Sequence, residues 1–505
     1  MSARSRFARA GLGVLGAACA LTLFAGTAGA AVGQPGADSI GDPYYPGAGN
    51  GGYDVAHYDI RLTYQPATDQ LAGTTTILAR TTQDLSSFNL DFLLKVSSVR
   101  VNNAPAQFSQ ADGELVVRPA ASLAKNTDVT VVVRYADVPS TVEHDGYTSW
   151  VRTADGALAV DEPNSAPWWF PSNNHPLDKA TYDVSVAVPD DVSALSNGTL
   201  VRTSKDIAGW TRWSWRSTQP QATYLAFLVV GKYDIHSGTA PNGQPFLTAY
   251  GADLGASTDA AKASVQRTPE ILDFLSDQFG AYPFEAQGGV VSTGLGFALE
   301  TQTRPVYSDR FFLRGSNTSV VVHENAHQWF GDSVSVHGWR DIWLNEGFAS
   351  YAEWLWSEAE GEGTAQQLAD YIYDYYPADH EFWQVLPGDP GPENQFDDAV
   401  YDRGALTLQA LRNAVGDEAF FTIIRTWVAE HRYGNGTIEQ FVALAEKISG
   451  KPLYDLFQTW LFTKGKPADS AAVGVSSAPA RATVAEPKSF ATLRETHALL
   501  ARSGG

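Results

Sequence analysis

The sequence contains almost no sulfur and carries few positive charges relative to its negative ones. Among its 505 residues are one cysteine and one methionine, so the chain has no second cysteine for an internal disulfide. Lys and Arg number 35 against 56 Asp and Glu, which gives a formal net charge of −21. Nucleic-acid binding requires a basic surface, and this charge balance argues against it. We therefore expect a soluble protein that does not bind nucleic acid.

The sequence also lacks any apolar run of the roughly 20 residues that a membrane-spanning helix needs. Its apolar stretch at residues 12–24 has about 13 residues, follows three arginines, and precedes an A-x-A pattern that ends at Ala30. This arrangement predicts a signal peptide over residues 1–30, cleaved near Ala30, and hence a secreted protein without stable membrane insertion. Lipid anchoring at Cys19 is the less favoured alternative, because the apolar run continues beyond this cysteine.

The rest of the chain is 44% apolar and 18% charged, enough to build more than one hydrophobic core. Residues 31–52 are rich in Gly, Pro and Ala and predict a flexible leader. Apolar and polar residues then alternate in segments such as "HYDIRLTY" (57–64), with turn residues between them. Alternation is typical of half-buried strands, so residues 53–240 are predicted to form a mainly antiparallel β domain.

From about Ser257 the periodicity becomes helical and stays so to about residue 465, and residues 241–467 are predicted to form a second domain. In "GTIEQFVALAEKISG", Thr437 and Gln440 have the spacing of a capping box, and Gly450 is typical of a helix end. Residues 468–505 are an Ala-, Ser- and Pro-rich tail whose end can form a short terminal helix. The predicted fold class is a multidomain α+β chain, an antiparallel β domain followed by a mainly helical domain.

The stretch "VVHENAHQWFG" places His323 and His327 four residues apart, with Glu324 directly after the first histidine. Positions i and i+4 share one helix face about 5–6 Å apart, so both imidazoles can reach one metal ion. The alternative is a polar stripe on an ordinary helix. A catalytic zinc site needs a third protein ligand and a position left for water.

A third ligand lies at a suitable distance. Glu346 follows His327 after 18 intervening residues, and it starts a second amphipathic segment that can pack across the first. The metzincin arrangement requires glycine and histidine where Phe330 and Ser333 stand, so that class is excluded.

These two blocks, "HENAHQWFGDSV" and "WRDIWLNEGFASY", closely resemble the zinc aminopeptidases related to aminopeptidase N and to leukotriene hydrolase/aminopeptidase. The resemblance extends over residues 53–467 and implies a thermolysin-like catalytic domain after the β domain. It also implies one zinc ion per chain, held by His323, His327 and Glu346, with Glu324 as the general base.

An aminopeptidase must also recognise the free α-ammonium of its substrate, which requires carboxylates beside the metal. The segment "GLGFALETQT" resembles the G-A-M-E-N segment of the family, with Phe297, Leu299 and Thr301 as departures from it. The resemblance implies that Glu300 binds the amine and that Ala298 contacts the substrate. Phe297 is expected to alter substrate specificity.

Two further segments match parts of the family. "VDEPNSAPWWFP" resembles the family element whose acidic residue contacts the substrate amine, which implies that role for Glu162, although Pro167 replaces the usual arginine. The alternative for Glu162 is an ordinary surface-loop glutamate. "AVYDRGAL" lies downstream of the ligand blocks and resembles the family segment whose tyrosine stabilises the oxyanion, here Tyr401.

Together these features predict a monomeric, secreted zinc aminopeptidase acting on peptides with a free N-terminus. An endopeptidase or epoxide hydrolase on the same zinc core, and a catalytically inactive binding module, remain alternatives. Larger relatives have a helical C-terminal domain that encloses the site. The residues after Pro467 are too few for such a domain, so we expect a comparatively open cleft.

Overall fold

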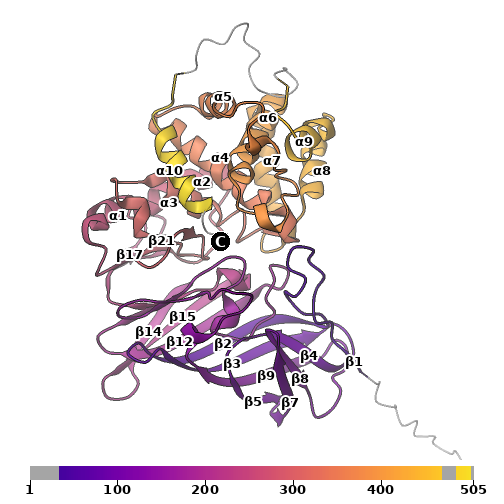
Figure 1. Ribbon diagram of the computed structural model, residues 1–505, viewed down its shortest axis with the longest axis vertical. Helices are drawn as coiled ribbons and strands as arrows, with labels where there is room; N and C mark the ends of the chain where they lie inside the picture. Colours follow the sequence, from indigo (N-terminus) through magenta and orange to yellow (C-terminus); the bar gives the residue numbers. More distant parts are fainter. Residues whose placement is uncertain (1–32, 469–484, 502–505) are drawn as a thin grey trace, which may run out of the picture. The chain divides into compact units, whose positions relative to one another are not determined.

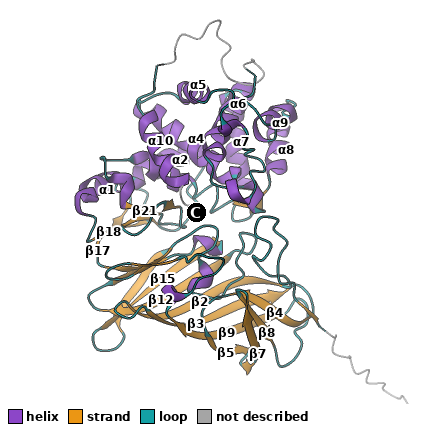
Figure 2. Ribbon diagram, viewed as in Figure 1, coloured by secondary structure: helices purple, strands orange, loops and turns teal. Residues whose placement is uncertain are grey.

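The computed structural model describes residues 33–468 and 485–501, so the predicted signal peptide lies outside these ranges. Figure 2 shows strands dominating the earlier part of the described chain and helices the later part. The expected order of a β-rich part followed by a helical part is confirmed.

The β-rich part is built around an eight-stranded sheet (Figure 1). All neighbouring strands in it run antiparallel except β12 and β2, which are parallel. In order across the sheet, the strands are β14 (Thr199–Lys205), β15 (Trp210–Gln221), β12 (Ala180–Pro189), β2 (Tyr53–Gln65), β3 (Gln70–Thr81), β9 (Asp128–Asp137), β5 (Val96–Val101) and β6 (Ala104–Pro105).

The alternation seen in the sequence decides which face of this sheet is buried. In β2, Tyr58, Ile60, Leu62 and Tyr64 are at most 1% exposed, while the residues between them are partly or fully exposed. Successive side chains of a strand point to opposite faces, so every second residue enters the core. The half-buried strand predicted at residues 57–64 is confirmed.

Two four-stranded sheets complete the β-rich part. The first contains β1 (Gln34–Pro35), β4 (Leu85–Asp91), β8 (Glu114–Arg118) and β7 (Gln107–Ala111). The second contains β10 (Trp150–Arg152), β11 (Ala157–Ala159), β16 (Leu228–Gly231) and β13 (Ser193–Leu195).

The described part of the expected flexible leader, residues 33–52, makes specific contacts. Its strand β1 pairs with β4. Asp42 is only 5% exposed, lies 3.1 Å from His175 Nε2, and accepts a hydrogen bond from the backbone nitrogen of Trp339. Gly and Pro content therefore indicated a segment without regular structure, while long-range hydrogen bonds hold it against the rest of the chain.

The later part begins with a mixed five-stranded sheet of β17 (Tyr233–Thr239), β18 (Pro245–Gly251), β19 (Gln287–Ser292), β21 (Val306–Ser308) and β20 (Ala298–Leu299). Because β17 pairs with β18, it belongs to this sheet although it precedes the predicted boundary at residue 240. Strands β22 (Ser335–Val336) and β23 (Asn435–Gly436) form a small separate pair.

Helices make up most of the remaining residues. They are α1 (Thr258–Val265), α2 (Thr268–Phe279), α3 (Thr318–Ala326), α4 (Trp343–Glu360), α5 (Ala365–Tyr375), α6 (Gly404–Val415), α7 (Asp417–Glu430), α8 (Ile438–Ser449), α9 (Tyr454–Leu461) and α10 (Phe490–Leu500). In α8, Thr437 and Gln440 form the predicted capping box, and Gly450 ends the helix in the left-handed conformation. None of the helices in the described ranges is long and apolar enough to cross a membrane.

Candidate metal centre

Helices α3 and α4 pack against each other and carry the predicted metal ligands. The side chain of Asn317 caps α3 by accepting a hydrogen bond from the third residue after it. His323 lies within α3, His327 stands at its end, and Glu346 occupies the first turn of α4. The chain turns away after His327, where Gly331 adopts a φ of 129° that strongly favours glycine.

The three predicted ligand side chains converge on one point. Oε2 of Glu346 lies 3.3 Å from Nε2 of His323 and 3.5 Å from Nε2 of His327, and the three ligand atoms lie within 4.8 Å of one another. Ligands at about 2.0–2.1 Å in a tetrahedral zinc site are about 3.3–3.4 Å apart. Two imidazole nitrogens and one carboxylate oxygen also form a usual catalytic donor set for zinc. The residues present therefore fit zinc.

The other ring nitrogen of each histidine is held by a second residue. Nδ1 of His323 donates to Oε1 of Glu353 at 2.7 Å, and Nδ1 of His327 donates to the carbonyl oxygen of Phe330 at 3.0 Å. Such partners fix the tautomer and leave Nε2 available to the metal. Glu353 was missed at the sequence level, although it lies seven residues after Glu346 and thus on the same face of α4.

Glu324 is 1% exposed and lines the same cavity as the three ligands. Burial raises the pKa of its carboxyl to about 8, an effect that the two ligand histidines partly oppose. A carboxyl group in such a place can take up and release a proton near neutral pH.

Two more carboxylates line this cavity and come from distant parts of the chain. Glu300 directly follows β20, is 2% exposed, and accepts a hydrogen bond from the hydroxyl of Tyr224 at 3.2 Å. Glu162 comes from the β-rich part, and its Oε1 is buried without a hydrogen-bond partner among the described residues. Burial raises the pKa of both carboxyls, and Glu300 raises that of Glu162 further. Ala298, the first residue of β20, also lines the cavity.

Tyr401 lies in a π-helical turn, Ala399–Arg403, immediately before α6. It is 3% exposed, and its ring lies 5.8 Å from that of His323. Burial raises the pKa of its hydroxyl well above the usual value, with nearby carboxylates adding to the effect, so the hydroxyl stays protonated and can donate a hydrogen bond. Turns of π-helix occur frequently at functional sites.

The structure thus brings all eight predicted site residues to one cavity, from segments that span Glu162 to Tyr401. This cavity has a volume of about 20 Å³, and its wall is completed by Phe297, Leu299, Phe396 and Leu500. Leu500 belongs to α10, so a helix of the predicted tail contributes to the wall of this cavity, which the count of residues after Pro467 did not anticipate.

Two sequence comparisons and one structural comparison place this arrangement among known proteins. Residues 55–225 match the Peptidase M1 N-terminal domain, and residues 270–460 match the Peptidase family M1 domain. The chain is 26% identical to glutamyl aminopeptidase of Rattus norvegicus and 25% identical to aminopeptidase M1 of Arabidopsis thaliana, matching 81% and 82% of this chain. These alignments cover 47% and 51% of the two relatives, so the chain spans about half the length of the curated relatives it matches.

Solved structures resemble the chain over most of its length. An M1 zinc metallopeptidase from Deinococcus radiodurans matches 87% of this chain and 100% of its own, with a TM-score of 0.77 and 29% identity. A mutant M1 zinc metallopeptidase from the same organism, bound to a Tyr-Ser-Ala substrate, matches 88% of this chain with a TM-score of 0.75.

Proposed function

Because this chain belongs to the M1 family of zinc metallopeptidases, we propose that it is a secreted aminopeptidase that removes the N-terminal residue of peptides. The observation that carries this proposal is the position of Glu300 and Glu162, whose carboxyl groups line the same cavity as the metal ligands. Buried carboxylates without a counter-charge are costly, and the α-ammonium of a peptide would supply that charge.

The roles of the remaining residues follow from their positions. His323, His327 and Glu346 would hold zinc, which when bound lowers the pKa of a water molecule and polarises the substrate carbonyl. Glu324 accepts the proton of the attacking water and delivers it to the leaving amine. Tyr401 donates a hydrogen bond to the carbonyl oxygen as that oxygen gains negative charge. Glu300 and Glu162 hold the ammonium, so that the first peptide bond lies beside Glu324.

The proposal is tested by comparing a short peptide with its N-acetylated copy. Acetylation removes the positive charge that Glu300 and Glu162 are proposed to bind, so kcat/KM for the acetylated peptide should be at least tenfold lower (about 1.4 kcal/mol or more). Cleavage products identified by mass spectrometry should show release of the first residue alone. A zinc chelator should stop cleavage and serves as the control.

Other outcomes of this experiment point to the alternatives. Equal rates on the two peptides, with internal cleavage, would favour an endopeptidase. No chelator-sensitive cleavage of either peptide would favour an inactive binding module.

Glu300→Gln provides a sharper test of where the amine binds. Charge-assisted hydrogen bonds contribute about 1.5–3 kcal/mol, so kcat/KM for the free peptide should fall about ten- to a hundredfold. Zinc content should not change, because Glu300 is not among the metal ligands. Since the acetylated peptide has no ammonium to lose, its rate should change much less. If the variant slows both peptides equally, Glu300 does not bind the amine.

A further inference from the structure

Helix α10 reaches the metal centre although it follows the residues that the M1 domain model matches. The family match ends at residue 460, and α10 follows at Phe490–Leu500. Figure 1 shows α10, in yellow, beside α3, and the two helices are in contact.

The docking of α10 is specific rather than merely apolar. Phe490, Leu493 and Leu500 are at most 6% exposed. The hydroxyl of Thr496 accepts a hydrogen bond of 2.9 Å from Nδ2 of Asn317, the residue that caps α3. Buried polar groups with matched partners indicate a contact that is formed in one register.

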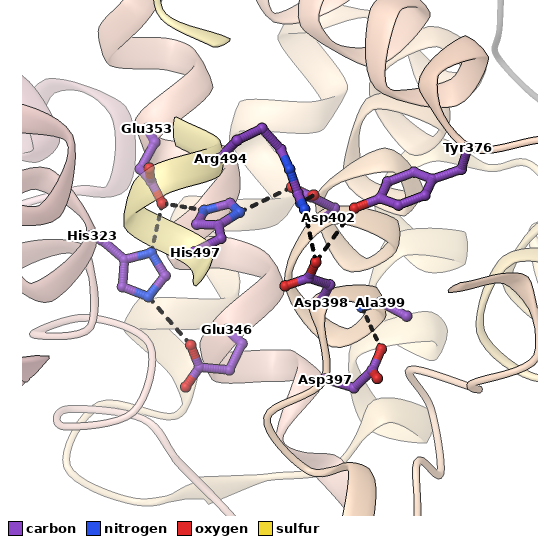
Figure 3. A network of polar contacts seen from close by, with 10 residues as sticks. All are labelled: His323, Glu346, Glu353, Tyr376, Asp397, Asp398, Ala399, Asp402, Arg494 and His497. Carbon is purple, nitrogen blue, oxygen red and sulfur yellow. Dashed lines mark hydrogen bonds and ion pairs between the residues drawn. The ribbon is translucent and has the colours of Figure 1, made fainter. Parts of the chain in front are cut away.

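His497 of α10 joins two carboxylates beside the metal centre (Figure 3). Its Nε2 lies 2.9 Å from Oε1 of Glu353, and its Nδ1 lies 3.1 Å from Oδ1 of Asp402. All three side chains are 1% exposed. Because ionised carboxylate oxygens only accept hydrogen bonds, both nitrogens of His497 donate and the ring is positively charged. Burial alone would lower the pKa of His497, but these two carboxylates raise it well above its usual value.

Each of the two carboxylates is linked to a residue of the catalytic centre, Glu353 to His323 and Asp402 to Tyr401. Oε1 of Glu353 accepts from His497 and also from Nδ1 of the ligand His323. Asp402 directly follows Tyr401 in the π-helical turn, and Nη1 of Arg494, also on α10, donates to it at 2.9 Å. One imidazole ring therefore connects the residue that orients a metal ligand with the turn that carries Tyr401.

We propose that His497 is a positioning residue that holds His323 and Tyr401 in fixed relation, which makes α10 an integral part of the catalytic centre. The part concerning Tyr401 rests on the function proposed above, whereas the part concerning His323 requires only that zinc binds. Leu500, one turn further along α10, lines the cavity and places the end of the same helix against the substrate site.

Two substitutions separate the two connections. The amide nitrogen of Asn lies near the position of Nδ1 of histidine, and that of Gln lies near Nε2. His497→Asn therefore keeps the contact with Asp402 and loses the contact with Glu353. His497→Gln keeps the contact with Glu353 and loses the contact with Asp402. Glu495→Gln is the matched control, because Glu495 lies on the same helix but pairs with Arg314, which is 81% exposed.

We expect His497→Asn to raise the dissociation constant for zinc about tenfold, measured by competition with a chelator in the absence of peptide, since loss of ligand-orienting partners typically costs that much or more. His497→Gln should bind zinc as the native protein does and lower kcat about tenfold at saturating zinc with little change in KM, because Tyr401 acts in the transition state. Glu495→Gln should change neither quantity.

Three results would overturn the proposal. The first is that both His497 variants keep the zinc affinity and kcat of the native protein. The second is that His497→Asn binds zinc more tightly than the native protein. The third is that Glu495→Gln loses as much zinc affinity or kcat as the His497 variants. The second would mean that His497 acts on the metal only by charge repulsion. If the His497 variants do not fold, Asp402→Asn tests the same link, and an unchanged kcat in it would contradict the proposal. Zinc affinity is measured without peptide, so its outcome stands even if the substrate turns out not to need a free amine.

Discussion

Glu324→Gln is expected to lower kcat by about 10²- to 10⁴-fold, the usual contribution of a general base, while zinc stays bound. Gln has the same shape as Glu but cannot accept a proton. The ligands His323, His327 and Glu346 remain unchanged, so the metal content should equal that of the native protein. Steady-state kinetics and metal analysis of the same preparation measure both quantities.

The pH profile gives a second readout for this residue. In the native protein the rate should fall as the pH drops through the pKa of Glu324, because a protonated carboxyl cannot take up the proton of the attacking water. Burial raises this pKa to about 8, and the positive charge of bound zinc would lower it from there. In the Gln variant this acidic limb should disappear.

A matched control is Glu360→Gln, at the end of α4, where the carboxylate pairs with Arg267 at the surface. It should leave kcat, zinc content and the pH profile unchanged. A Glu324→Gln protein that retained more than about a tenth of the native kcat would contradict the assignment of Glu324 as general base.

Tyr401→Phe should lower kcat by about 10²- to 10³-fold, the usual cost of removing one oxyanion donor. The hydroxyl is not needed to hold zinc or the substrate amine, so zinc affinity should stay near the native value and KM should change little. The buried ring keeps its shape, so the packing of the π-helical turn should be retained. Single-turnover kinetics on a free peptide would isolate the chemical step.

Tyr351→Phe controls for the loss of a buried tyrosine hydroxyl. Tyr351 is 1% exposed and donates to Gln409 at 2.8 Å, outside the residues that line the zinc cavity. We expect it to lower the free energy of unfolding by about 1 kcal/mol and to leave kcat unchanged. If the two variants lose activity equally, the hydroxyl of Tyr401 has a structural rather than a catalytic role.

Some residues were identifiable because their signals are local. His323, Glu324 and His327 share one helical stretch, and helix geometry alone places the two imidazoles on one face. The alternation of apolar and polar residues in β2 and the capping box of α8 likewise depend only on residues close together in the sequence. Glu353 could also have been identified from the sequence, because it follows Glu346 by seven residues and therefore lies on the same face of one helix.

Other features depend on contacts between residues far apart in the chain. Asp42 pairs with His175, and His497 joins Glu353 to Asp402, although "RETHALL" carries no pattern that would select its histidine. The place of Leu500 in the cavity wall likewise results from the docking of α10, which counting the residues after Pro467 did not predict.

By itself, the sequence determined the metal, its three expected ligands and the order of a β-rich and a helical part, because each rests on spacing within an element or on two adjacent blocks. Only the tertiary structure decided that His497 joins Glu353 to Asp402 and that Leu500 of α10 lines the cavity. Burial and hydrogen bonding across hundreds of residues depend on how the elements pack, and no local periodicity encodes that packing.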